Sequence, residues 1–322
     1  MNKGFSRFAW AVLAYNLPVI LWGAYVRVSF SGDGCGAHWP TCNGQVLPGQ
    51  MTTPTLIEFT HRMMTTVDTV AVVGLCIWAF LAFPKRDPTR RYAVLSLLFL
   101  LIEAALGAGL VLLRHVARDA SAGRAWYLSA HLVNTMLLLA ALTATAWLGT
   151  KSGARFRLAR IPRPIWGALV VTVLVSITGA VAALGDTLFP AASLAEGMRR
   201  DFSSASSMLL RLRLVHPAVA ILGVVYLIWA AAAMLRGKPE GDPLRATGAR
   251  VIALALFQMV LGALNLSLLA PVWMQLIHLL VADVVWISVV LLALEAGKTV
   301  SRLSAGSLAS AAPGSLRGAS TR

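Results

Sequence analysis

The stretch that decides the fold is residues 58–83, EFTHRMMTTVDTVAVVGLCIWAFLAF, in which Glu58 and His61 come directly before an apolar run. The run over 62–83 is close to the ~20 residues that a helix needs to cross the hydrocarbon of a bilayer. A histidine is costly in lipid and rare there, so one at the edge of such a run is a candidate site residue. The same arrangement recurs three more times along the chain, at His131, His216 and His278.

Eight apolar runs of similar length cover most of the sequence. The chain is 58% hydrophobic and only 13% charged, whereas a soluble domain is about a quarter charged. The runs lie near residues 8–28, 62–83, 92–113, 129–148, 165–185, 214–235, 251–270 and 276–296. The sequence therefore predicts an all-α integral membrane protein with eight transmembrane helices, surrounded by lipid.

The basic residues predict how these helices are oriented. A net charge of +15 is compatible with nucleic-acid binding, but these charges lie in short loops between apolar runs, where they set topology. The main set is Lys3, Arg7, Lys85, Arg86, Arg90, Arg91, Lys151, Arg155, Arg157, Arg160, Arg163, Arg236, Lys238, Arg245, Arg250, Lys298, Arg302, Arg317 and Arg322. The positive-inside rule places both termini in the cytoplasm and the loops 29–60 and 186–212 outside it. We expect a bacterial-type cytoplasmic membrane, no nucleic-acid partner, and all four histidines toward the extracytoplasmic side.

The chain also repeats itself at about half its length. Gly23-Ala24 corresponds to Gly179-Ala180, and Leu106-Gly107-Ala108 to Leu261-Gly262-Ala263. Small residues recur in all membrane helices because they allow close packing, but the histidines repeat in the same order. We therefore expect two pseudo-symmetric four-helix bundles, over 1–148 and 165–297, joined by a cytoplasmic linker over 149–164. The N-terminal run is too long for a cleaved signal peptide, and the tail over 298–322 is predicted to be disordered.

Four histidines at one depth predict two pairs of axial ligands to heme iron in a helix bundle. A single histidine in such a position is more often a packed core residue, but repetition on four helices favours ligands. Zinc is not indicated, because no short-range ligand pairs accompany the histidines. The acidic residues Asp68 and Glu103 should face the bundle interior, and Asp283 is a weak candidate for a partner of His278.

Two features surround the first histidine. Glu58 precedes His61 by three residues, so both share a helix face; Glu58 is either an interfacial charge or a proton carrier beside a ligand. Cys35 and Cys42 lie in an outer loop, where thiols tend to be oxidised. That disulfide is either a structural brace or a redox-active pair.

These residues together resemble the heme A synthase family, over nearly the whole chain up to about residue 297. The matching segments are Gly23-Ala24-Tyr25-Val26-Arg27, Ser31-Gly32, the loop 34–44, Glu58-Phe59-Thr60-His61-Arg62 and the three later histidines. The resemblance implies oxidation of a methyl group of heme O to a formyl group, through hydroxylation with water-derived oxygen. It implies that His61 and His131 are catalytic residues that hold the substrate heme O, with Glu58 as the catalytic carboxylate beside them, and that His216 and His278 hold heme b. Heme O synthase is the partner that the family implies.

The second half departs from the first in ways that leave questions open. Pro217 follows His216 where Arg62 follows His61, so if Arg62 contacts a heme propionate, Arg211 or Arg213 is the candidate in the second half. The sequence names neither the electron acceptor nor the oligomeric state, including whether the chain forms a homo-oligomer. Two alternatives share the four histidines: a di-heme cytochrome b that only transfers electrons, and a heme carrier.

Overall fold

Eight long helices form the body of the computed structural model, which describes residues 2–151, 154–203 and 208–299. They are α1 (Lys3–Val28), α2 (Thr53–Ala82), α3 (Pro88–Leu112), α4 (Ala122–Thr150), α5 (Arg163–Leu188), α7 (Met208–Leu235), α8 (Pro243–Ser267) and α9 (Val272–Ala296). Each is long and apolar enough to cross a membrane. The prediction of an all-α, multi-pass membrane protein is confirmed.

Two of the even-numbered apolar runs, α2 and α4, begin earlier as helices than hydropathy indicates, because polar N-caps start them outside the apolar segment. The Thr52 side chain accepts a hydrogen bond from the Thr55 amide at the start of α2, and Pro54 occupies the first turn, where a missing N–H costs nothing. Ser121 caps α4 in the same way. His61 and His131 therefore lie about two turns inside their helices.

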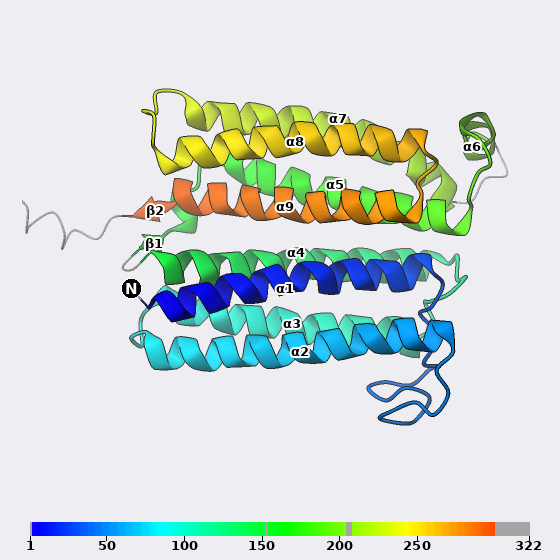
Figure 1. The fold of residues 1–322 in the computed structure, drawn as a ribbon. Helices are drawn as coiled ribbons and strands as arrows, with labels where there is room; N and C mark the ends of the chain where they lie inside the picture. The colour runs from blue at the N-terminus through cyan, green and yellow to red at the C-terminus, as the bar shows by residue number, and fades with distance from the viewer. Residues whose placement is uncertain (1, 152–153, 204–207, 300–322) are drawn as a thin grey trace, which may run out of the picture.

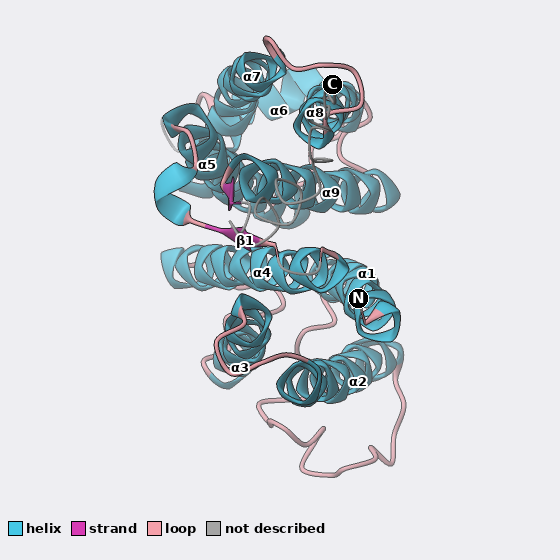
Figure 2. Ribbon diagram, turned by 90° about the vertical axis from the view of Figure 1, so that its left-hand side faces the viewer, coloured by secondary structure: helices cyan, strands magenta, loops and turns pink. Residues whose placement is uncertain are grey.

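The helices lie in four layers of two, α2/α3, α1/α4, α5/α9 and α7/α8 (Figures 1 and 2). The two central layers pack on each other: the indole Nε1 of Trp286 in α9 donates to the Met136 carbonyl of α4 at 2.7 Å. Trp147 at the far end of α4 donates to Glu295 of α9 at 2.8 Å. The apolar core of the first four long helices thus extends to Trp286, Val290 and Leu294 of α9, and a second core lies among the last four long helices. A symmetry relation between the two sets of helices stays a prediction.

Connecting segments gather at the two ends of the molecule (Figure 1). One end has the N-terminus and a two-strand ladder of β1 (Arg155–Phe156) and β2 (Lys298–Thr299), with the 3-10 turn η1 (Leu158–Arg160) following β1. Lys298 and Thr299 are thus ordered, contrary to the predicted start of the disordered tail; 300–322 lie outside the described residues. The opposite end has the 29–52 loop and the short helix α6 (Leu194–Asp201), which hydropathy did not predict.

Candidate functional site

Each of the four histidines packs against a glycine on the neighbouring helix. A Cβ built on Gly23 of α1 would lie 3.0 Å from Cε1 of His61, and one built on Gly179 of α5 would lie 3.0 Å from Cε1 of His216. The corresponding distances are 3.8 Å for Gly107 of α3 and His131, and 3.2 Å for Gly262 of α8 and His278. The small residues that indicated a duplication therefore make room for imidazole rings.

The structure brings the histidines together as two pairs. His61 and His131 lie close enough to interact electrostatically, and so do His216 and His278. In the first pair the Nδ1 atoms of both rings are buried without a hydrogen-bond partner. In the second pair Nδ1 of His278 is likewise unpartnered, whereas Nδ1 of His216 lies 3.1 Å from Thr178 Oγ1.

These residues fit a heme. Buried polar atoms without partners are costly, and two neighbouring imidazoles that each pack against a glycine can act as axial ligands. The described residues contain no group of three or more His, Cys, Asp or Glu side chains placed to bind a metal ion. A heme iron needs at most two protein ligands, since the porphyrin supplies the other four.

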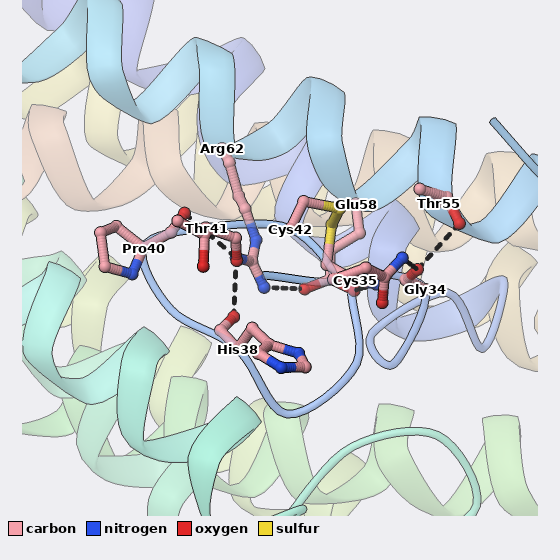
Figure 3. A network of polar contacts seen from close by, with 10 residues as sticks. Gly34, Cys35, His38, Pro40, Thr41, Cys42, Thr55, Glu58 and Arg62 are labelled. Atoms are coloured by element: carbon pink, nitrogen blue, oxygen red, sulfur yellow. Dashed lines mark hydrogen bonds and ion pairs between the residues drawn. A yellow bond between two sulfur atoms is a disulfide. The ribbon is translucent and has the colours of Figure 1, made fainter. Parts of the chain in front are cut away.

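The Glu58 carboxylate connects α2 to the cysteine loop (Figure 3). Its Oε2 accepts a hydrogen bond from the Cys35 amide at 2.9 Å, and its Oε1 accepts from Nη2 of Arg62 at 2.5 Å. Nη1 of Arg62 donates to the carbonyls of His38 at 2.9 Å and Thr41 at 2.7 Å. Glu58 and Arg62 are both buried at this contact, so the loop covers the carboxylate from outside.

Cys35 and Cys42 form a disulfide, which confirms that pairing, and both are buried. The loop is docked closely: a Cβ on Gly34 would lie 2.4 Å from the Pro54 backbone, so only glycine fits there. The Thr55 hydroxyl donates to the Gly34 carbonyl at 2.8 Å. The disulfide therefore supports the segment that holds Glu58, whichever redox role it has.

The candidate arginines of the second half are arranged differently. Arg213 lies three residues before His216, and its guanidinium donates to Asp201 at 2.5 and 3.0 Å and to Asp186 at 3.1 Å. Arg211 is exposed at the same helix end. The ion pairs tie α6 to α5 and α7. Sequence reasoning missed this arrangement, because an aspartate in a polar loop carries no periodic signal.

Other polar neighbours of the histidines come from inside apolar runs. The expected Asp283 partner of His278 is replaced by Gln258, whose Nε2 lies 3.3 Å from Nε2 of His278 and donates to its carbonyl at 3.0 Å. Oδ2 of Asp283 is buried without a partner. Asp68 faces the interior, as expected, and accepts from Asn16 of α1 at 2.9 Å. The signal for Gln258 was available: a polar residue within the seventh run.

The fold and site define a class: a multi-pass helical membrane protein with two pairs of buried histidines, one beside a docked disulfide loop. A family model described as cytochrome oxidase assembly protein matches residues 6–290. The chain belongs to this family.

Several known proteins are similar to parts or most of this chain. A Thermus thermophilus protein named protoheme IX farnesyltransferase is 42% identical over 293 residues, which cover 90% of this chain and 48% of that protein. The heme A synthase of Exiguobacterium sibiricum is 32% identical over 183 residues, 56% of this chain and 59% of its own length. That of Geobacillus kaustophilus is 37% identical over 111 residues, 34% of this chain and 35% of its own length. The chain thus spans about half the length of the first of these curated relatives.

Proposed function

We propose that this chain is a heme A synthase that oxidises the methyl group of heme O to a formyl group. The observation that carries the proposal is the covered carboxylate of Glu58, held by Arg62 and the Cys35 amide one turn from His61. A site that only passes electrons between hemes has no need of such a group. The relatives named heme A synthase support the same activity.

The first histidine pair, His61 and His131, would hold heme O as the substrate. The second pair, His216 and His278, would hold heme b. Heme b held by these two histidines would supply one-electron transfer. The chain's own part is to orient the substrate methyl group toward Glu58 and to limit the entry of water.

The reaction balances as a methyl group plus one water giving a formyl group, four protons and four electrons. Glu58 would stabilise positive charge that develops on the methyl carbon, and would accept a proton from the attacking water. Arg62 holds one carboxylate oxygen, so the carboxylate keeps a fixed direction. The four electrons require an acceptor, which the chain itself does not identify.

Topology and partners follow from the same proposal. The basic residues favour a cytoplasmic position for the molecular end that has the N-terminus and β1, with the cysteine loop and both histidine pairs toward the other side. A partner that farnesylates protoheme would deliver the substrate. The Thermus thermophilus match to a protein of that name supports this connection.

The test is to produce the full chain in cells that make heme O but no heme A, and to analyse the extracted hemes by chromatography and mass. Heme A, or its hydroxylated precursor, is the expected product. Unchanged heme O beside heme B, even after an electron acceptor is added, would contradict the proposal and favour the di-heme cytochrome.

A further inference from the structure

Glu103 of α3 is a half-buried acidic residue that the proposed reaction does not use. Nδ2 of Asn134 donates to its Oε2 at 2.5 Å, and the Thr135 hydroxyl donates to its Oε1. The same Oε1 lies 3.5 Å from Nδ1 of His131, one helix turn away on α4. Nδ1 of His131 is buried and has no hydrogen-bond partner. Glu103 is therefore the acceptor that faces this nitrogen.

The second half has an amide at the matching place. The register that relates Gly107 to Gly262 also relates Glu103 to Gln258. Gln258 of α8 also lies beside a histidine of the following helix, but at the other ring nitrogen. Its Nε2 lies 3.3 Å from Nε2 of His278 and donates to the His278 carbonyl at 3.0 Å, while Nδ1 of His278 has no hydrogen-bond partner. A carboxylate can only accept here, whereas this amide donates.

We propose that Glu103 is the positioning residue that makes the first histidine pair chemically different from the second. Its carboxylate accepts the Nδ1–H of His131, which fixes the tautomer that leaves Nε2 for the substrate iron. This inference rests on the proposed function in one respect, namely that His131 is a ligand of the substrate heme.

Two physical consequences follow. Asn134 and Thr135 both donate to the carboxylate, so Glu103 is held as an acceptor and its direction is fixed by two neighbours on α4. An imidazole that donates to a carboxylate is a more basic ligand and pushes electron density onto the metal. The first heme iron would then have the lower reduction potential, which suits a macrocycle from which electrons must be removed. The second, beside Gln258, would have the higher potential and accept them.

The experiment compares Glu103→Gln with the reciprocal Gln258→Glu in the full, heme-loaded chain. The readouts are a potentiometric titration in visible absorption and the low-temperature EPR spectrum, with the two components assigned by His131→Ala and His278→Ala variants. We expect Glu103→Gln to raise the potential of the first-pair heme alone and to lower turnover roughly 10- to 100-fold. Gln258→Glu is the control: its carboxylate would lie beside Nε2 of His278, not Nδ1, and it should leave the first-pair potential unchanged.

An unchanged first-pair potential and spectrum in Glu103→Gln would overturn the inference, whatever the turnover. If that variant does not accumulate, Glu103→Asp decides alone, because its shorter side chain weakens the contact with Nδ1 of His131; a first-pair potential that then fails to rise overturns the inference. The proposed function has its own test: it fails if the unaltered chain produces no heme A. The reduction potentials can be measured without turnover, so the two failures are distinguishable. Glu103→Asp keeps a carboxylate acceptor, so it should raise the first-pair potential less than Glu103→Gln does.

Discussion

The two histidine pairs have the same backbone setting and different chemical neighbours. In both, an imidazole packs against a glycine of the adjacent helix, and a Cβ built on that glycine would lie 3.0 Å from Cε1 of His61 or of His216. The first pair has Glu58 and Glu103 nearby, each held by hydrogen bonds from its surroundings. The second pair has the neutral Thr178 and Gln258 instead. The comparison teaches that similar helix packing can surround the two pairs with different polar groups, and on the proposed function those groups would separate heme retention from reaction.

The largest effect is expected from removing the histidines themselves. His216→Ala or His278→Ala should abolish stably bound heme b, because each removes an axial ligand from a buried pair. His61→Ala or His131→Ala should keep that heme and lose product formation. The measurement is heme content per purified protein, alongside extracted heme A. Equal loss of heme from all four variants would show that the two histidine pairs do not have separate functions.

Glu58→Gln should come next in size. The amide cannot accept a proton, so product formation should fall by roughly 10²- to 10⁴-fold while bound heme remains. Extracted heme A and its hydroxylated precursor are measured against total heme. Glu196→Gln is the matched control: that carboxylate lies on α6, 3.6 Å from Arg200, and like Glu58 it accepts a hydrogen bond from a backbone amide, that of Ala192. Normal turnover in Glu58→Gln would remove the catalytic role from this residue.

The sequence predicts the depth of the histidines, because each lies at the edge of an apolar run. It does not by itself predict that each imidazole packs against a glycine of the neighbouring helix. Helix starts were placed too late, since N-caps such as Thr52 and Ser121 extend α2 and α4 beyond the apolar run.

Contacts between distant segments could not be predicted. Asp201 and Arg213 meet only because α6 folds back on α7. Gln258 meets His278 because adjacent helices fix the rotation of each, and rotation depends on packing that hydropathy does not record.

The glycines test whether the two pairs depend equally on close packing. Gly23→Ala and Gly179→Ala each place a methyl group 3.0 Å from an imidazole carbon, and overpacking of this kind costs about 1–3 kcal/mol. We expect Gly23→Ala to weaken substrate turnover and Gly179→Ala to weaken heme b retention. Gly74→Ala is the control, because a Cβ there meets nothing within 4 Å. If Gly179→Ala keeps its heme and Gly23→Ala keeps its turnover, the ring positions are not set by these contacts.

The smallest effect on turnover is expected from changes in the outer loops, which the two halves hold in different ways. The first loop has the disulfide Cys35–Cys42 and hydrogen bonds to Glu58 and Arg62, whereas the second is tied by ion pairs of Arg213. Replacing both cysteines by serine should lower stability by about 2–4 kcal/mol. It should lower turnover less than Glu58→Gln does, because Arg62 still holds the carboxylate.

Turnover and thermal stability of the double-serine variant are measured together to separate a brace from a redox pair. A brace predicts partial turnover that recovers at lower temperature, where the loop stays docked. A redox pair predicts loss as complete as in Glu58→Gln at every temperature, since electrons would lose their route. The double change of Asp186 and Asp201 to Asn is the matched variant in the second loop, and should lower stability without an effect on extracted heme A beyond that loss.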